Sequence, residues 1–79
     1  MERFEVLVEL KPEVLDTQGR AILSTLQRLG HGELKNVAVS KRFVVEIEAS
    51  ADEAFQKAEN LAKEHLANPV SETFLVRKL

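Results

Sequence analysis

Apolar residues recur in this chain with two different spacings, and the order of these spacings constrains the fold most strongly. Alternation with a period of two, rich in β-branched residues, indicates a strand with one buried face. Apolar residues three and four positions apart indicate an amphipathic helix. The first pattern predicts strands over residues 3–10, 34–40, 42–49 and 70–78, and the second predicts one helix after Asp16 and one after Ser50. The predicted element order is therefore βαββαβ, within a single domain formed by residues 1–79.

The ends of both predicted helices carry capping residues. Asp16 is a good N-cap for the first helix, and Gly30 is expected to end it in the left-handed conformation. Gly19 lies on the apolar stripe of this helix, where glycine costs about 1 kcal/mol relative to alanine. Its presence indicates either a close backbone approach or a later helix start. The second helix is expected to begin with a capping box at residues 50–53 and to stop before Asn68-Pro69.

The element order predicts an α+β, ferredoxin-like fold. The second and third strands meet at Ser40–Arg42, so they should form an antiparallel hairpin. Right-handed connections then place both helices on one face of a four-stranded antiparallel sheet. The apolar side chains expected on the other, open face are Leu7, Ala38, Val44 and Leu75. An apolar centre inside a charged rim is typical of a protein contact surface. We therefore predict self-association through these four residues, which Leu7→Lys or Val44→Lys should weaken.

Composition excludes several kinds of site. The chain has no cysteine, which excludes disulfides, thiolate metal sites and thiol catalysis. His31 and His65 are the only histidines, and they lack metal-ligand spacing. No phosphate-binding, dinucleotide-binding or nucleophile motif is present. We therefore expect no catalytic, cofactor-binding or metal-binding residues in this chain.

The size and charge of the chain indicate what it associates with. A domain of 79 residues buries only about 60% of its unfolded surface, and small domains usually add a disulfide, a metal or a partner. We therefore expect a homo-oligomer.

Charge and aromatic placement disfavour binding to nucleic acid. The net charge of −2 gives no general attraction to a phosphate backbone. By the alternation of the strands, the aromatic residues Phe4, Phe43 and Phe74 fall in the core, which disfavours an RNA-recognition module. Because no apolar run approaches the ~20 residues of a membrane span, and the N-terminal residues lack a signal-peptide pattern, we expect a cytoplasmic protein without membrane contact.

Two stretches of the sequence resemble one known family. Residues 11–19, KPEVLDTQG, are similar to the K-x-x-V-L-D-P-Q-G signature of the PurS family, and LANPVSE at 66–72 matches the C-terminal part of the same pattern. Leu29-Gly30, Val37 and Lys41 also fall at the spacings of the family. The resemblance covers essentially the whole chain. The departures from the pattern are Thr17 in place of proline, Ser40 in place of glycine, Ala62 in place of cysteine and Ser71 in place of an aliphatic residue.

The resemblance implies a non-catalytic subunit of phosphoribosylformylglycinamidine (FGAM) synthase, a glutamine amidotransferase-type C–N ligase complex of purine biosynthesis. Such a subunit is implied to bridge the synthetase and glutaminase subunits and to support ammonia transfer, as a dimer or tetramer. ATP and magnesium would be used by the synthetase subunit, with no cofactor in this chain. The candidates for partner contacts among the matched stretches are Lys11, Gln18, Lys41 and Arg42. The residues alone leave one alternative open, a stand-alone regulatory dimer that senses a small molecule.

Overall fold

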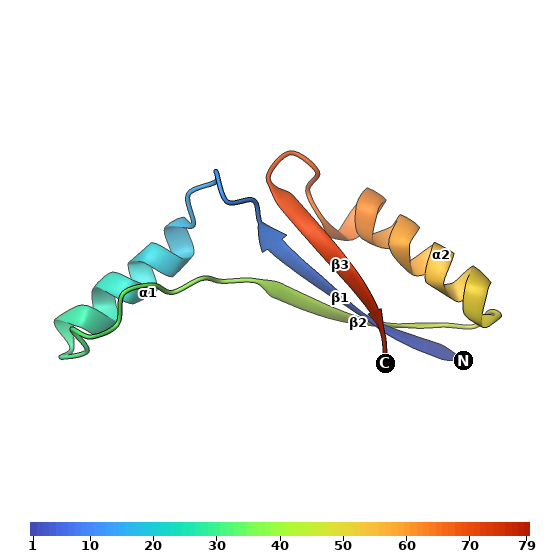
Figure 1. Cartoon of the computed structure of the whole chain (residues 1–79), viewed down its shortest axis with the longest axis horizontal. Coiled ribbons are helices and arrows are strands. Elements are labelled where there is room, and N and C mark those ends of the chain that lie inside the picture. Colours follow the sequence, from blue (N-terminus) through green and yellow to red (C-terminus); the bar gives the residue numbers. More distant parts are fainter.

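The structure is a computed structural model that describes residues 1–79, and its two parts differ sharply in packing (Figure 1). One part is an antiparallel sheet with a helix on one face. The other is an arm, defined here as residues 15–40, that extends beyond the end of the sheet. The elements in chain order are β1 (Glu2–Leu10), α1 (Thr17–Arg28), β2 (Lys41–Ile47), α2 (Ala51–Leu61), a π-helical turn η1 (Ala62–Leu66) and β3 (Glu72–Lys78).

The sheet has three strands in the order β2-β1-β3, with β1 antiparallel to both neighbours. Val6 lies opposite Phe43 on β2 and opposite Val76 on β3, so the helix-facing side chains of the three strands are in register. Alternation assigns these side chains to the core, and the structure confirms this for the three strands of the sheet. Val37 and Val39, which alternation assigns to the same core, lie instead in the arm and are only half-buried. The buried apolar residues are Phe4, Val6, Val8, Ala54, Ala58, Ala62, Ala67 and Val76. The fully buried residues of α2 and η1 are all alanines, whose small side chains allow these helices to approach the sheet closely.

Both ends of the second helix follow from local hydrogen bonds. The Ser50 hydroxyl accepts a bond from the Glu53 backbone N–H at 3.4 Å, which confirms Ser50 as the N-cap. At the other end the helix widens into the π-helical turn η1, whose last bond runs from the Ala67 N–H to the Ala62 carbonyl at 2.9 Å. The chain leaves the helix just before Asn68-Pro69, as predicted.

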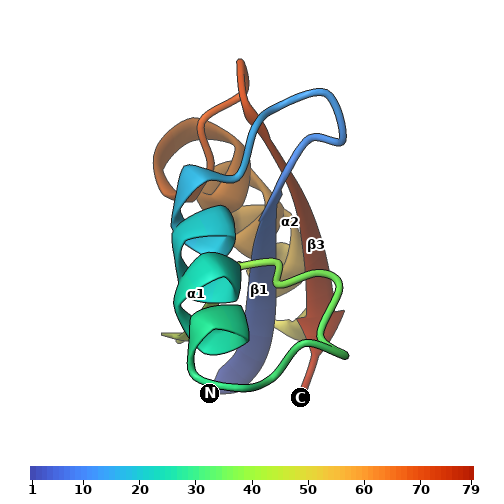
Figure 2. The same cartoon turned by 90° about the vertical axis from the view of Figure 1, so that its left-hand side faces the viewer.

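Helix α1 begins and ends where the sequence predicts. Asp16 is its N-cap, and Gly30 follows its end with a φ of 107°. However, α1 packs against neither the sheet nor α2. Figure 2, viewed from the end that carries the arm, shows α1 in the foreground with the sheet behind it.

The predicted four-stranded sheet with both helices on one face is corrected in three respects. The sheet has three strands, residues 34–40 form no strand, and only α2 covers the sheet. The predicted hairpin at Ser40–Arg42 is absent, because residues 34–47 run on without reversing direction (Figure 1). A tight hairpin requires residues with positive φ, usually glycine or asparagine, and here only Gly30 has one. Without the reversal, segment 34–40 cannot fold back beside β2. Helix α1, which is bonded to this segment, therefore does not reach the sheet.

The molecule is consequently elongated. Its extents are 50 × 24 × 13 Å and its radius of gyration is 16.2 Å, against about 12 Å for a compact domain of this length. Both termini lie at the end far from the arm (Figure 1), where the Leu79 N–H donates to the Arg3 carbonyl at 3.0 Å. Neither helix has the length and apolar character needed to cross a membrane.

Candidate interaction surfaces

The arm is held together by the side chain of Asp16. One carboxylate oxygen accepts from the Gly19 N–H at 2.8 Å and the other from the Val39 N–H at 2.9 Å. The bond from Val39 and then that from Gly19 lower the pKa of this carboxyl below its ordinary 3.8. A single residue therefore caps α1 and fastens the returning segment to it.

Gly19 permits the same contact on the backbone side. A Cβ at this position would lie 2.2 Å from the Val37 carbonyl oxygen, so no larger residue fits without moving the segment. This confirms the close backbone approach predicted for Gly19. Near the other end of α1, the Gln27 side-chain amide donates to the Leu34 carbonyl at 2.8 Å. The arm is thus a helix and an extended segment lying side by side.

The arm carries exposed apolar side chains that no other element of the chain covers. Leu15, Ile22 and Leu29 are exposed, and a shallow apolar depression lies over Ala21, Ile22, Thr25 and Leu26. Residues 35–40 form no hydrogen bond between backbone groups. Unpaired extended backbone next to apolar side chains is a template for pairing with another chain.

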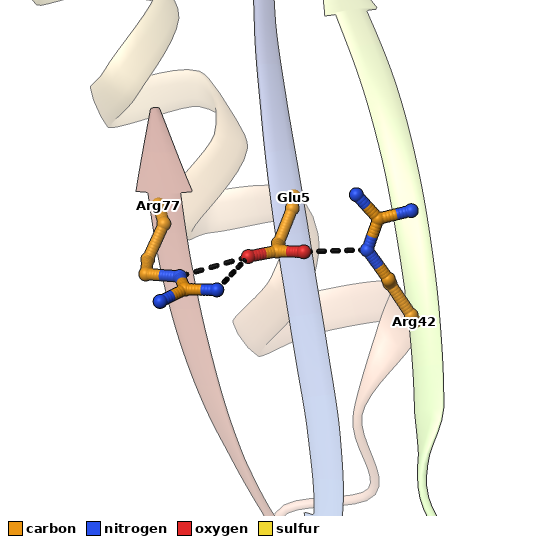
Figure 3. A network of polar contacts seen from close by, with 3 residues as sticks. All are labelled: Glu5, Arg42 and Arg77. Atoms are coloured by element: carbon orange, nitrogen blue, oxygen red, sulfur yellow. Dashed lines mark hydrogen bonds and ion pairs between the residues drawn. The ribbon is translucent and has the colours of Figure 1, made fainter. Parts of the chain in front are cut away.

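The open face of the sheet, on the side away from α2, carries a charged cluster at its centre (Figure 3). Glu5 on β1 lies between Arg42 on β2 and Arg77 on β3. Its carboxylate accepts from the Arg42 Nε at 2.5 Å and from the Arg77 Nε at 2.8 Å, and also from one Nη of Arg77. Glu5 is only 5% exposed, whereas the two arginine side chains are 52% and 61% exposed. The arginines therefore cover the carboxylate and keep their outer surfaces in solvent.

The two arginines also determine the ionisation of Glu5. A buried carboxylate is strongly destabilised unless it is paired and hydrogen-bonded. The bond from Arg42, followed by that from Arg77, lowers the pKa of the Glu5 carboxyl below its ordinary 4.5. Glu5 is thus held as an anion between two cations.

Three of the four predicted self-association residues lie on this open face. Leu7 and Leu75 are direct cross-strand partners, and Val44 lies opposite Glu5. Leu75 and Val44 are exposed and Leu7 is half-buried. Ala38 is exposed but belongs to the arm, away from the other three.

The loop that matches the C-terminal part of the family pattern is held by bonds between side chains and backbone groups. The Glu72 carboxylate accepts from the Asn68 N–H at 2.7 Å, which is the main reason why the pKa of Glu72 is lowered, and Lys41 adds an ion pair at 3.4 Å. The Asn68 side chain accepts from the Val70 N–H at 3.0 Å. Lys11 donates to the Pro69 carbonyl at 2.9 Å. These bonds give Asn68 and Lys11 structural roles at the junction of β1 and β3.

A cavity of about 350 Å³ lies where the sheet meets the arm. It brings together two of the four candidate contact residues, because both Gln18 and Lys41 line it. Gln18 is exposed and its side chain forms no hydrogen bond within the chain. Arg42, the fourth candidate, lies apart on the open face with Glu5.

The Glu5 cluster is the arrangement that reasoning from sequence missed. Alternation places Glu5 and Arg77 in the charged rim of the open face, and it shows the face but not which strands are neighbours. With the strand order known, a glutamate in the central strand flanked by an arginine on each side is the signal. No group of three or more histidine or acidic side chains is placed to hold a metal ion.

Comparison with known proteins identifies the family. The family model described as PurS, phosphoribosylformylglycinamidine (FGAM) synthase, matches residues 3–78. The phosphoribosylformylglycinamidine synthase subunit PurS of Mycobacterium leprae is 38% identical over 78 residues, which span 99% of this chain and 96% of that protein.

Solved structures agree with this match. The structure of PurS from Bacillus subtilis superimposes with a TM-score of 0.90 at 29% identity, covering 100% of this chain and 99% of that one. A chain in the structure of PurLQS from Thermotoga maritima superimposes with a TM-score of 0.75 at 28% identity, covering 99% and 96%. The match over nearly the whole length, in sequence and in fold, shows that the chain belongs to the PurS family of FGAM synthase.

Proposed function

We propose that this chain acts within FGAM synthase as a non-catalytic subunit that bridges the synthetase and glutaminase subunits and supports ammonia transfer between them. The observation that carries the proposal is the full-length likeness to PurS subunits, one of them within a PurLQS structure. The chain itself offers surfaces rather than reacting groups, namely an apolar arm and an arginine-bearing sheet face. In this proposal ATP and magnesium act on the synthetase subunit.

The proposal includes self-association, and the arm is the surface we assign to it. β2 is an edge strand, and residues 35–40 of the arm lack backbone partners. Added to the free edge of β2 in a second copy, this segment would supply the fourth strand that the sequence predicts. The hydrophobic side chains of β2 on the α2 side, Phe43, Val45 and Ile47, are only half-buried.

An exchanged arm would also bury what the single chain exposes. α1 would then lie beside α2 on the sheet of the other copy, with Ile22 directed at apolar surface instead of solvent. Two copies exchanging arms in this way would each complete a βαββαβ unit. The predicted fold would then be correct for the pair of chains and incomplete for one.

The candidate contact residues keep their proposed role in this arrangement. Gln18 and Lys41 face the cavity where the arm leaves the sheet. Neither is needed to hold a helix cap, and the exposed Lys41 side chain has a single ion pair within the chain, with Glu72. We therefore propose that this junction contacts one of the larger subunits, whereas Lys11 serves mainly the fold of the loop at Pro69.

The test is amidation by the purified synthetase and glutaminase subunits with and without this chain. The proposal expects glutamine-dependent turnover only when the chain is present, and ammonia-dependent turnover in both cases. Equal turnover with glutamine in its absence would contradict the bridging role. A regulatory dimer that binds a small molecule would then be the leading hypothesis, and a thermal shift with amino acids or nucleotides would test it.

A further inference from the structure

Three charged side chains meet at the centre of the open sheet face, and their charges do not cancel. Glu5 pairs with both Arg42 and Arg77, so two positive charges surround one negative charge and leave a net charge of +1. One arginine would be enough to pair the carboxylate. The second therefore adds a positive charge to the surface that the burial of Glu5 does not require.

The guanidinium groups retain unused donors that face outward. Arginine carries five N–H donors in a planar fork. Arg42 bonds to Glu5 through Nε alone, and Arg77 through Nε and one Nη. Neither arginine has a second acidic partner in the chain. Since Glu5 already holds one side of each group, a ligand that binds the free Nη atoms meets arginines whose orientation is set in advance, which lowers the entropic cost of binding.

The surroundings of the cluster match the composition of binding hot spots. Leu7, Val44 and Leu75 lie next to it and are exposed or half-buried. Arginines beside apolar side chains at the centre of a face are enriched among residues that dominate binding energy. The other cation of this face, Arg3, is neutralised by Glu46 at 3.4 Å. The positive charge is therefore concentrated between β2 and β3.

We propose that Arg42 and Arg77, oriented by Glu5, dock a carboxylate-bearing surface of one of the larger subunits, with Leu7, Val44 and Leu75 packing around the contact. This inference rests on the proposed function. The chemistry favours an acidic partner surface, because free guanidinium donors match carboxylates in geometry and charge. A second copy meeting this face with its own would bring two clusters of the same net charge together, and the arm already offers a surface to the second copy.

The experiment measures binding of the full-length chain to the purified synthetase and glutaminase subunits, and the mass of the free chain by light scattering. We expect Arg42→Gln and Arg77→Gln each to weaken binding to the same subunit about tenfold, with the mass unchanged. Arg77→Lys should also weaken it, because lysine keeps the charge but not the fork. Glu5→Gln should weaken it too, although it raises the net charge of the patch by one. Arg3→Gln is the matched control on the same face, expected within about twofold of wild type because its charge is already paired.

Each other outcome overturns the proposal in a recognisable way. Wild-type affinity in both arginine variants, or an equal loss in Arg3→Gln, excludes a specific docking site at this cluster. A change in mass with partner binding retained assigns the face to a second copy. Tighter binding of Glu5→Gln shows that charge alone acts and that Glu5 orients nothing. If the wild-type chain binds neither subunit, the proposed function itself is wrong. The wild-type measurement alone shows this, so the two failures are distinguishable. Thermal unfolding of each variant verifies that it is folded, and Arg77→Lys keeps the test valid should a glutamine variant unfold.

Discussion

The sheet with α2 and the arm are parts of one short chain, but they are stabilised in different ways. In the sheet, Phe4, Val6 and Val8 are almost completely inaccessible and pack on three alanines of the helix. In the arm the only buried residue is Gly19, and large apolar side chains such as Leu29 are exposed. The arm depends on directional bonds that the Asp16 carboxylate accepts and the Gln27 amide donates, rather than on burial.

The difference shows which part is stabilised within one chain and which part presents a contact surface. Burial of apolar area is the dominant favourable term in folding, and only the sheet with α2 achieves it within one chain. A few hydrogen bonds contribute about 1 kcal/mol each and define a shape without providing a core. The arm therefore has a defined form whose apolar surface remains available to another chain.

The largest effect is expected from a cavity in the sheet core. Phe4→Ala should reduce the free energy of unfolding by about 3–5 kcal/mol, because the Phe4 side chain is 1% exposed and packs against Phe55, with 5.9 Å between the ring centroids. Chemical denaturation followed by circular dichroism measures the change. Val70→Ala, at an 82% exposed site, is the control and should stay within about 0.5 kcal/mol. A similar loss in both variants would mean that the sheet core is no better packed than the surface.

The next largest effect shows whether the arm or the open face of the sheet forms the self-association interface. If the arm is exchanged, Ile22→Glu should lower the mass in solution towards the 8.9 kDa of one chain, because it places a charge in an apolar contact. Val44→Lys on the open face should leave the mass unchanged. Light scattering at several concentrations measures both. The reverse result would restore the interface predicted from sequence, through Leu7, Val44 and Leu75.

A smaller and more local effect is expected at Gly19. Gly19→Ala places a Cβ against the Val37 carbonyl, and overpacking of this kind costs about 1–3 kcal/mol, more than the gain in helix propensity. The Val37–Val39 segment should separate from α1, while the sheet amides keep their protection in hydrogen exchange. Gly32→Ala is the matched control, since its added Cβ would touch nothing. Loss of protection in the sheet as well would show that the arm and the sheet unfold together.

The smallest effect is a dependence of the arm on pH. The pKa of Asp16 is lower in the folded arm than its ordinary 3.8, so its contribution to stability is fully present above that value. The contribution is lost as the pH falls through the lowered pKa. NMR of the Val39 amide should therefore show a step at acidic pH.

Two variants identify the carboxyl group whose titration causes this step. In Asp16→Asn the step should disappear, because the titrating carboxylate is gone. Asp52→Asn, which removes an exposed carboxylate in α2, should leave it in place. A step that persists in Asp16→Asn would place its origin in another group.

Local pattern was sufficient for most of the elements. The alternation in β1 and β3 and the caps at Asp16 and Ser50 depend on residues within a few positions of each other, and the structure confirms all four. Family membership also followed from short matched stretches, and the comparisons confirm it. The close approach at Gly19 was one of two interpretations that the sequence allowed, and the structure selected it.

The rest was decided by tertiary structure, because it depends on which distant segments meet. Residues 40–42 include neither glycine nor asparagine, which disfavours a tight turn, but they do not show where the chain goes instead. Its straight course separates a three-stranded sheet with an arm from a closed four-stranded sheet. The cluster of Glu5, Arg42 and Arg77 exists only because β1 lies between β2 and β3. Sequence by itself determined periodicity and caps, since these arise from the local geometry of the backbone. Strand order and the direction of the arm are long-range choices, determined by which surfaces can be buried and which are left for other chains.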